Sequence, residues 1–594
     1  MIIHTLSSFP FHRPVLALAV ALVCATGRVS ATTISVSGGC TLVNAINNAN
    51  ADADTDGSQV GCPAGKGADT IVLTAGKMYT LTKAFDGDNG LPSISSTITI
   101  SGNGATLQRS RIEGTPRFRL LHIADTGNLT IEQLKLKNGH VFNEGGGIHN
   151  QGNLALVDSI VSGNTAIRQD SDCWGYVFFC DGNGGGISNG SGTLKLYNST
   201  VVDNSSGIRG GGIYNSNGEV ISTNSVVSRN RSSYGGGVFN AQGTLSSAQT
   251  RFDSNTAEVK RRSIVGPSGY QYYLGAQGGG IFNGGSAITK GVEDTIVNNK
   301  AINKWGGDYF QGGGSFGGGG VFNSGIMQLT NITFRNNQSY SVIVLNGFEE
   351  LGGGGLFNNG NLTLTHSTLS LNKAGNNKGG GVSNQSTMTL RNSLIADSIS
   401  GGDCVSSGGV TMNGVNLIED GSCGALLSGD PKLMVLLLYN GGLTPTQALR
   451  ATSPAIDAAG SDFCVGTDQR GVARPQPKAG KCDIGAFERI STTPSSVSAL
   501  VQFFDANVTN GDITGTGEGA MAIAKLHAFR NQLLTAGDYK GRNLKTKACD
   551  QLVSTFKRID PDNKPDAGDY VTGSNADTLA GKVTALGNGW GCHG

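Results

Sequence analysis

The chain has 594 residues, 93 of them glycine, and a formal net charge of +1. Without residues 1–31, which contain two arginines and no acid, 42 basic and 43 acidic residues remain. A chain so close to neutral has no electrostatic attraction to nucleic acid or to an anionic membrane, so we expect neither as a partner. The glycine content is more than twice the usual ~7%, but the glycines recur in register, which excludes a disordered chain.

Residues 1–31 have the pattern of a secretory signal peptide. Arg13 precedes the apolar run Val15–Ala25, and Val29–Ala31 provides small residues for cleavage. The run is too short to span a membrane, and the rest of the chain has no comparable stretch. We therefore expect a secreted or cell-surface protein with no transmembrane segment in the mature chain.

The cysteines predict disulfides. Of eleven cysteines, Cys24 lies in the signal peptide and ten stay in the mature chain. An even number in an exported chain favours disulfides over metal ligands. Proximity in the sequence pairs them as Cys40/Cys62, Cys173/Cys180, Cys404/Cys423, Cys464/Cys482 and Cys549/Cys592.

Residues 32–94 precede a long repetitive region and are expected to cap its N-terminal end. Leu42–Ile46 would belong to a short helix, and GADTIVL at 67–73 would open a strand. A cap is needed because the end of a stack of strands exposes unpaired backbone and an open core. The strand segment and NANAD at 48–52 resemble the CSLREA domain of bacterial exported β-helix proteins, although Cys40–Ala45 departs from the Ser, Arg and Glu of that motif.

Residues 95–429 are built on a repeat of three glycines, an aliphatic residue, a variable residue and an asparagine. Its closest copies are 25–26 residues apart, a period typical of a solenoid. Within a unit, apolar and polar residues alternate, as at Leu362 and Leu364, which predicts short strands and no helix. The eight copies end at Asn150, Asn189, Asn215, Asn240, Asn283, Asn323, Asn358 and Asn384.

Alignment of the units gives two further columns. One is apolar and should face inward: Val161, Val201, Val227, Phe252, Ile296, Phe334, Leu369 and Ile395. The other, three residues later, should form a polar ladder at a bend: Asn164, Asn204, Asn230, Asn255, Asn299, Asn337 and Asn372, then Ser398. We predict an all-β fold, a right-handed parallel β-helix with three short strands per coil. The pattern resembles the β-helix proteins grouped with pectate lyases and polymorphic outer-membrane repeats.

Four insertions interrupt the repeat at one point of its period, so they should emerge along one edge of the solenoid. They span roughly 165–183, 256–277, 300–317 and 338–352. Aromatic side chains on protruding loops suit stacking on sugar rings or protein contact. The alternative is that the loops fold back and pack on the coils. The binding candidates are Trp174, Tyr176, Tyr270, Tyr272, Tyr273, Trp305, Tyr309 and Phe310.

A second set of aromatic residues forms a column inside the repeat: Tyr214, Phe239, Phe282, Phe322 and Phe357. Residues stacked at one position of a β-helix usually pack against each other. We therefore interpret this column as structural. His149 and His366 are lone histidines in repeat positions, and we expect surface or packing roles for them.

Catalysis of the pectate-lyase type is the alternative function. It needs acidic residues on neighbouring coils to hold Ca²⁺ and a basic residue to remove a proton α to a carboxylate. The outward columns supply only a small candidate set: Asp203, Arg229, Asp253 and Arg335. This alternative rests mainly on analogy of fold, a weak warrant for function.

Residues 430–490 contain four motifs whose order resembles the choice-of-anchor Q region of the same bacterial proteins. The resemblance implies terminal β-helix turns that lead to an attachment device. We expect Asp468 and Arg470 to form a buried ion pair. The motifs are Asn440–Gly442, Ser453–Ala458, Asp468–Gly471 and Asp483–Glu488.

Residues 497–594 follow a linker at 491–496 and have helical periodicity. Apolar residues recur at helical spacing from Met521 to Leu534 and again from Leu552 to Ile559. We predict a small helical domain, which resembles the FIMAH-type domains of bacterial secreted proteins.

These patterns favour a non-catalytic exported protein of adhesin type. We expect it to be a monomer without a resident cofactor that binds a polysaccharide or a cell-surface protein through loops on one edge of the solenoid. The alternative is a Ca²⁺-dependent polysaccharide lyase of the pectate-lyase type.

Overall fold

The computed structural model describes residues 31–592 with internal gaps. The gaps are residues 56–60, 168–181, 260–262, 266–270, 274, 304–316, 342–351, 376, 451, 477–479, 491–496, 561–564 and 567. Only the backbone is described at 263–265, 271–273 and 520. The predicted linker and all of the predicted signal peptide except Ala31 therefore lie outside the described residues.

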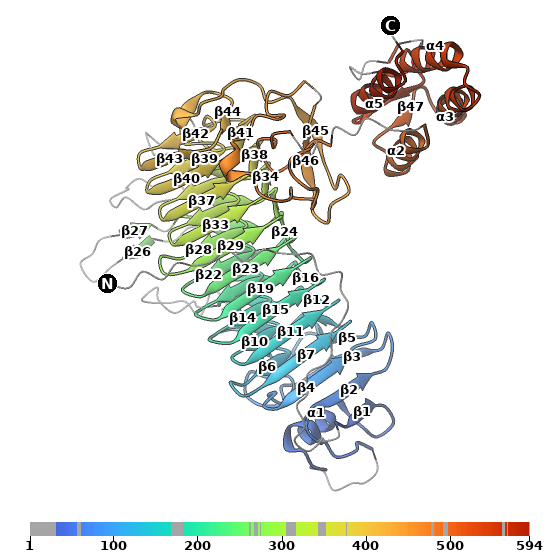
Figure 1. The fold of residues 1–594 in the computed structure, drawn as a ribbon. Coiled ribbons are helices and arrows are strands. Elements are labelled where there is room, and N and C mark those ends of the chain that lie inside the picture. Colours follow the sequence, from blue (N-terminus) through green and yellow to red (C-terminus); the bar gives the residue numbers. More distant parts are fainter. Residues whose placement is uncertain are drawn as a thin grey trace, which may run out of the picture.

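Four parallel sheets wrap around one axis and form the right-handed parallel β-helix that the sequence predicts (Figure 1). We number them so that each central coil passes through sheet III, sheet I, sheet II and sheet IV in turn. Sheet III contains the aliphatic and asparagine residues of the glycine repeat. Register is kept from coil to coil, so that Ile148, Ile187 and Ile213 are direct neighbours.

The strands of the coils are short. Sheet I contains β1 (Thr33–Val36), β2 (Asp69–Leu73), β4 (Thr97–Ser101), β7 (Asn128–Glu132), β11 (Asn153–Val157), β15 (Thr193–Tyr197), β19 (Glu219–Thr223), β23 (Thr244–Ala248), β29 (Ile288–Val292), β33 (Ile326–Thr330), β37 (Asn361–Thr365), β40 (Thr387–Arg391) and β43 (Gly409–Asn413). Sheet II contains β3 (Met78–Leu81), β5 (Thr106–Arg109), β8 (Lys135–Lys137), β12 (Ile160–Ser162), β16 (Thr200–Val202), β20 (Val226–Ser228), β24 (Arg251–Asp253), β30 (Thr295–Val297), β34 (Thr333–Arg335), β38 (Thr368–Ser370), β41 (Leu394–Ala396) and β44 (Leu417–Ile418). Sheet III contains β6 (Leu121–Ile123), β10 (Ile148–Asn150), β14 (Ile187–Asn189), β18 (Ile213–Asn215), β22 (Val238–Asn240), β28 (Ile281–Asn283), β32 (Val321–Asn323), β36 (Leu356–Asn358), β39 (Val382–Asn384) and β42 (Cys404–Ser406).

Sheet IV departs from the prediction of three strands per coil, because it adds a fourth strand to seven of the coils. Each of its strands has only two to four residues, too few to give an alternating pattern that the sequence could reveal. They are β9 (His140–Val141), β13 (Thr165–Ala166), β17 (Ser205–Ser206), β21 (Arg231–Ser232), β25 (Thr256–Val259), β31 (Lys300–Asn303) and β35 (Gln338–Ser341).

The core of the solenoid is the predicted inward column together with the inward residues of sheets I and III. Every member of that column, from Val161 to Ile395, is at most 1% exposed. Both asparagine ladders also form. Asn204 Nδ2 donates to Asn230 Oδ1 at 3.0 Å, and Asn189 Nδ2 donates to Asn215 Oδ1 at 2.8 Å. Each buried amide thus has partners on the adjacent coils, which stabilises the stack.

The glycine triplets permit the turn into sheet III. Gly184 has φ +64°, and a Cβ on it would lie 2.4 Å from the carbonyl oxygen of Ile187. A Cβ on Gly185 would lie 2.5 Å from the carbonyl oxygen of Gly211, on the adjacent coil. The repeat is therefore glycine because both the turn and the neighbouring coil exclude a side chain.

The N-terminal end of the solenoid is covered by helix α1 (Leu42–Ala51). Thr41 Oγ1 caps it by accepting a hydrogen bond of 3.1 Å from the backbone N–H of Asn44. Ala45, Ile46 and Ala49 of the helix are fully buried against the first coils. Four of the five predicted disulfides form among the described residues, namely Cys40–Cys62, Cys404–Cys423, Cys464–Cys482 and Cys549–Cys592. Cys173 and Cys180 lie outside the described residues.

Residues 430–490 differ from the predicted terminal turns of the solenoid, and we call them the return segment. Their strands β45 (Leu433–Leu438) and β46 (Thr446–Leu449) pair antiparallel with each other and join none of the four sheets. The segment instead folds back over the outer face of sheet II (Figure 1). Leu394 and Ala396, which point outward from β41, are buried there beside Leu433 and Ile484 of the segment.

Short hydroxyl side chains of the late coils hold the return segment. Thr295 Oγ1 donates to the carbonyl oxygen of Pro445, and Thr333 Oγ1 donates to Gln469 Oε1, both at 2.6 Å. The backbone N–H of Ala486 donates to Thr368 Oγ1 at 2.9 Å. These contacts join residues more than 100 positions apart, so no local period in the sequence announces them.

The C-terminal region forms the predicted small helical domain. Its helices are α2 (Val497–Asn510), α3 (Ala520–Gly541), α4 (Lys545–Phe556) and α5 (Ala576–Gly589), with a two-strand sheet of β47 (Thr514–Gly515) and β48 (Val571–Thr572). Phe504, Phe529, Leu533 and Leu579 are at the centre of its own apolar core. Among the described residues, no helix has the length and apolarity needed to cross a membrane.

Candidate functional site

The four candidate lyase residues lie along the end of sheet II, where three of them come together. Arg229 pairs with Asp203 through two hydrogen bonds, Nε to Oδ1 at 2.8 Å and Nη2 to Oδ2 at 2.9 Å. The hydrogen bonding to Asp203 and the negative charge of that residue raise the pKa of Arg229 above its ordinary value. The charge of Asp253 has a smaller effect in the same direction. Arg229 is therefore held as a cation and is a poor proton acceptor.

Asp253 and Arg335 are engaged in other contacts. Asp253 Oδ1 accepts hydrogen bonds from Ser254 Oγ at 2.7 Å and from Asn298 Nδ2 at 3.1 Å. Arg335 Nη2 donates to the carbonyl oxygen of Val435 in the return segment at 2.7 Å. Arg335 thus contacts the backbone of the return segment, whereas the other three candidates come together.

This arrangement gives no support to a Ca²⁺ site. Within the part of the chain that the structure describes, no three His, Cys, Asp or Glu side chains are placed to hold one metal ion. Asp203 has both carboxylate oxygens on Arg229, which leaves it unsuited to share a cation with Asp253. The lyase alternative stays a prediction.

The aromatic residues of the insertions are mostly outside the described residues. These are Trp174, Tyr176, Tyr270, Trp305, Tyr309 and Phe310. Tyr272 and Tyr273 belong to strand β27 (Gln271–Tyr273), which pairs antiparallel with β26 (Ser263–Val265). Binding by these aromatic residues also stays a prediction.

The aromatic column of the repeat lies on the outer face of sheet III, between inward-facing aliphatic residues and asparagines. Phe239, Phe282, Phe322 and Phe357 stack with ring centroids 4.3–5.1 Å apart and planes within 6°. Phe322 and Phe357 are only 3% and 2% exposed. Because each ring face is covered by the next ring, the column has no free face for a sugar, and the packing interpretation is confirmed.

Towards the N-terminus the same column becomes polar. The register of β18, β14, β10 and β6 continues from Tyr214 to Ser188, His149 and His122. Glu144 and Arg119 flank these residues from the neighbouring turns. We call this group the polar patch: Asp88, Ser93, Arg119, His122, Glu144, His149, Gln151, Asn183 and Ser188.

Glu144 is at the centre of the polar patch. Its Oε1 accepts a hydrogen bond from Asn183 Nδ2, and its Oε2 accepts one from Ser188 Oγ, both at 3.1 Å. His149 Nε2 lies 3.9 Å from Oε2 of the same carboxylate. Two donors from the next coil therefore fix the carboxylate, while 37% of its side chain stays exposed.

The two histidines are adjacent, with ring centroids 5.3 Å apart. His122 Nε2 lies 2.9 Å from Gln151 Oε1, and its Nδ1 lies 2.8 Å from Ser93 Oγ, so both ring nitrogens have a hydrogen-bond partner. For His149, burial and the charges of Arg119 and His122 lower the pKa to about 4, so the ring is neutral at neutral pH.

Arg119 lies under the patch and only 9% of its side chain is exposed. Its Nε donates to the carbonyl oxygen of Glu144 at 3.2 Å, and its Nη1 donates to Asn89 Oδ1 at 2.7 Å. Asp88 pairs with its Nη2 at 3.8 Å. Burial lowers the pKa of this guanidinium, but it remains a cation with all three nitrogens engaged.

Sequence reasoning missed the polar patch although it noticed His149. The expectation of a lone histidine is wrong, because His122 occupies the equivalent position one coil earlier. His122 precedes the first glycine triplet, so it is absent from an alignment anchored on that repeat. His366 is a packing residue as expected: it is fully buried, and its Nε2 lies 3.1 Å from the carbonyl oxygen of Phe463.

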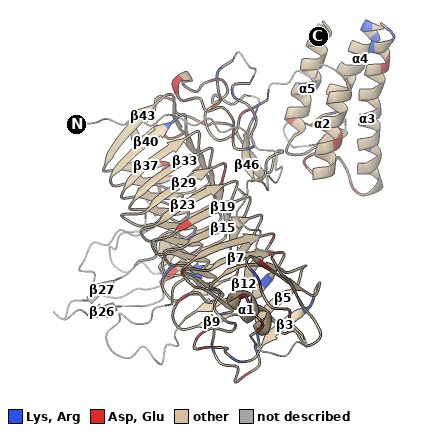
Figure 2. Cartoon of the chain, turned by 60° about the horizontal axis from the view of Figure 1, so that its bottom comes forward, with Lys and Arg blue, Asp and Glu red and all other residues tan. Residues whose placement is uncertain are grey.

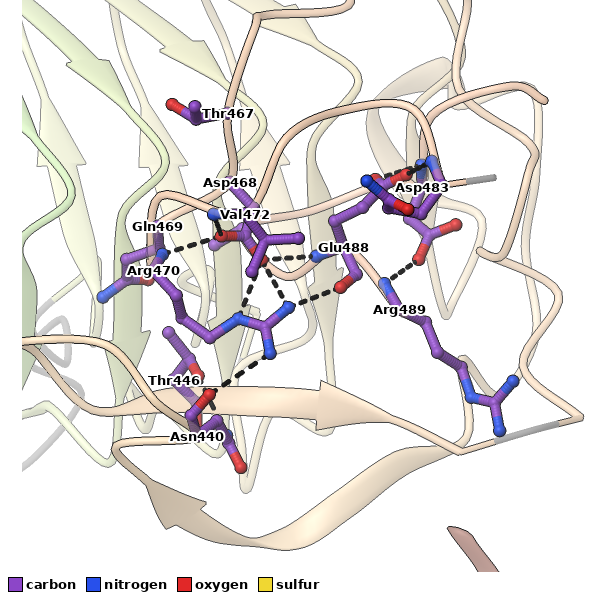
Figure 3. Close-up of polar contacts among 12 residues, drawn as sticks. Asn440, Thr446, Thr467, Asp468, Gln469, Arg470, Val472, Asp483, Glu488 and Arg489 are labelled. Carbon is purple, nitrogen blue, oxygen red and sulfur yellow. Dashed lines mark hydrogen bonds and ion pairs between the residues drawn. The ribbon is translucent and has the colours of Figure 1, made fainter. Parts of the chain in front are cut away.

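A second charged cluster belongs to the return segment and is structural (Figure 3). Asp468 and Arg470 form the predicted buried ion pair, with Arg470 Nε donating to Asp468 Oδ2 at 2.8 Å. Asp468 also accepts the backbone N–H groups of Val472 and Glu488, both at 2.9 Å. Arg474 pairs with Glu488 at 2.8 Å, and both side chains are fully buried. With its oxygens saturated by internal donors, this cluster holds loops together and offers nothing to a ligand.

Comparison with known proteins adds little to this geometry. No family model and no curated protein sequence matches the chain. Among solved structures, it is similar to the crystal structure of pectate lyase Pel9A at 11% identity, over 71% of this chain and 88% of that chain, with a TM-score of 0.36. A likeness at this level carries no argument about activity. The strand order by itself shows that the molecule is a right-handed parallel β-helix protein. The resemblances to the CSLREA domain and to the choice-of-anchor Q region stay predictions.

Proposed function

We propose that the protein is exported and binds a polysaccharide at the polar patch on the outer face of sheet III. The observation that carries this proposal is a fixed, partly exposed set of hydrogen-bonding side chains centred on Glu144. Carboxylate, imidazole and amide groups side by side suit the hydroxyls of a sugar, because they offer both donors and acceptors. Their hydrogen bonds to one another keep them in place before a ligand arrives, which lowers the entropy cost of binding.

The position of the first insertion supports the same proposal. Residues 168–181 immediately precede Gly182 in the sequence, and the next residue, Asn183, donates to Glu144. The predicted binding residues Trp174 and Tyr176 thus stand within ten positions of the patch along the chain. An aromatic loop beside a hydrogen-bonding patch would supply the apolar contact that sugar rings also need.

Export is supported by the cysteines. Four disulfides among the described residues are typical of an oxidising compartment, in agreement with the predicted signal peptide. The solenoid would then present the patch outside the cell.

Affinity electrophoresis of the mature protein in gels that contain single polysaccharides tests this proposal. We expect retardation by at least one of them, and the Gln151→Ala variant should lose most of it, because an exposed donor and acceptor is removed without touching the core. Glu219→Gln, an exposed change on the outer face of sheet I, is the matched control and should migrate like the wild type. Retardation that is equal in Gln151→Ala and wild type would place binding elsewhere.

The predicted role of the loops is tested in the same gels with Trp174→Ala and Trp305→Ala. Loss of retardation in Trp174→Ala and not in Trp305→Ala is expected if the loop beside Asn183 contributes. Loss in both would extend the site along the edge of the solenoid.

A further inference from the structure

The polar patch has an uneven distribution of charge between its surface and its interior. Its accessible charges are the carboxylates of Asp88, 42% exposed, and Glu144, 37% exposed. Its arginine, Arg119, is 9% exposed and is engaged by Asp88, Asn89 and the Glu144 carbonyl. A ligand that approaches therefore meets two carboxylates, the imidazoles of His122 and His149, and the amide of Gln151.

Two other arginines near the patch are also engaged. Arg117 lies over the ring of Phe142 at 4.3 Å, and Arg209, in register with Asn183, lies over the ring of Phe239 at 5.7 Å. In Figure 2 most of the coils are tan, with few positions coloured as charged residues. Recognition of a carboxylate sugar normally uses an arginine with a free planar edge. Arg119 is the arginine of the polar patch, and all three of its nitrogens are engaged, so it has no free edge; Arg117 and Arg209 are not members of the patch.

We infer that the ligand of the polar patch is a neutral, hydroxyl-rich glycan and not a polyuronate, and that it binds without a metal ion. The inference rests on the proposed function. Glu144 and Asp88 would accept hydrogen bonds from sugar hydroxyls, and Gln151 would both donate and accept. A uronate carboxylate at the same place would stand beside two like charges, which costs binding energy.

Equilibrium titration compares the two glycan classes directly. Mature protein is titrated with a neutral β-glucan, a galactomannan, polygalacturonate and alginate. Each titration is done in about 20 mM and about 500 mM NaCl, with Ca²⁺ or with a chelator. We expect a neutral glycan to bind with an affinity that changes by less than about twofold between the salts, because no net charge is neutralised. Polygalacturonate and alginate should bind at least about tenfold more weakly than the neutral glycan under all of these conditions, because of like-charge repulsion.

A charge-removal variant gives the converse test. The double variant Asp88→Asn/Glu144→Gln removes both accessible carboxylates and keeps groups of the same size. We expect the affinity ratio of polygalacturonate to neutral glycan to rise by about tenfold or more in low salt, since like-charge repulsion is lifted. Glu219→Gln removes one charge from sheet I and should leave the ratio unchanged, and thermal unfolding checks that each variant is folded.

The outcomes separate this inference from the proposed function. Wild-type protein that binds a polyuronate more tightly than any neutral glycan, or only with Ca²⁺, would overturn the inference and leave polysaccharide binding intact. A double variant with an unchanged ratio would also overturn it. Binding of no glycan of either class would end both the inference and the proposed function.

Discussion

Gln469 and Thr333 join the return segment to the solenoid: Thr333 Oγ1 donates to Gln469 Oε1 at 2.6 Å, across 136 residues of sequence. The amide nitrogen of Gln469 is also engaged, donating to Thr295 Oγ1 at 2.9 Å and to Thr444 Oγ1 at 3.0 Å. One side chain thus satisfies buried groups on two coils and in the segment itself. Gln469 has no exposed surface, so water cannot take its place as the hydrogen-bond partner of these groups.

Replacement of Gln469 should therefore destabilise the solenoid. Gln469→Leu keeps the volume but leaves the hydroxyl of Thr333 buried without its acceptor, and we expect a loss of about 2–4 kcal/mol in the free energy of unfolding. Urea denaturation measures this. Gln328→Leu makes the same change at an exposed position on sheet I and should cost less than about 0.5 kcal/mol. Equal effects of the two variants would contradict the role of Gln469.

Two aspartate–arginine pairs, one in the return segment and one at the end of sheet II, should differ in their contribution to stability. Asp468 is fully buried, so Asp468→Asn leaves the Arg470 charge without its partner, and the free energy of unfolding should fall by about 3–5 kcal/mol. The Asp203–Arg229 pair is exposed on both sides, and Asp203→Asn should cost less than about 1 kcal/mol. Parallel denaturation curves of the two variants make the comparison, and a larger loss in Asp203→Asn would refute it.

Acid should weaken the contact between the return segment and the solenoid. Burial and the nearby charge of Arg474 lower the pKa of His366 to about 3, below its unfolded value of 6.5. The folded state therefore favours the neutral ring, and stability that is complete above pH 6.5 is lost as the pH falls towards 3. At pH 4 the loss from this group should be roughly 3 kcal/mol.

The His366→Asn variant isolates this contribution, because an amide can still donate to the carbonyl oxygen of Phe463. We expect its unfolding free energy to fall less than that of the wild type between pH 7 and pH 4. His149, which faces Glu144, Arg119 and His122, is retained in both proteins, so its own loss on acidification cancels in the comparison. Identical pH profiles of the two proteins would mean that protonation of His366 does not weaken the contact between the return segment and the solenoid.

The lyase alternative predicts a reaction that can be followed by ultraviolet absorbance of the unsaturated uronate product. With polygalacturonate or alginate we expect no increase in absorbance that depends on Ca²⁺, since Asp203 is occupied by Arg229 and Arg335 by Val435. A Ca²⁺-dependent increase that disappears in Asp253→Ala or Arg229→Ala would establish a lyase and displace our proposal.

The periodic part of this molecule could be predicted because its information is local. A glycine triplet, an inward aliphatic residue and a ladder asparagine recur within each unit, and each coil repeats the packing of the last. Phe252 and Asn255 are therefore found where the alignment places them, in the core and in the ladder. The four disulfides follow for the same reason, since their partners are close in the sequence.

The return segment and the polar patch could not be predicted because they depend on contacts between distant residues. Nothing in the neighbourhood of Thr333 indicates that Gln469 will cover it. His122 and His149 are 27 positions apart in the printed sequence, and only the stacking of β6 on β10 brings their rings together. Glu144 lies beside His149 because the turn that precedes Gly145 brings its side chain to the outer face of sheet III. The carboxylates of sheet II carry the lyase alternative because they stand in the aligned columns.

The measurement that tests the central claim most directly is calorimetric titration of the His149→Ala protein with a glycan that the wild type binds. His149 lies in the middle of the polar patch, and its loss should weaken binding by about tenfold, the equivalent of one or two hydrogen bonds. Glu219→Gln should bind like the wild type. If His149→Ala, folded and with an unchanged melting temperature, binds the glycan as tightly as the wild type, the polar patch is not the binding site.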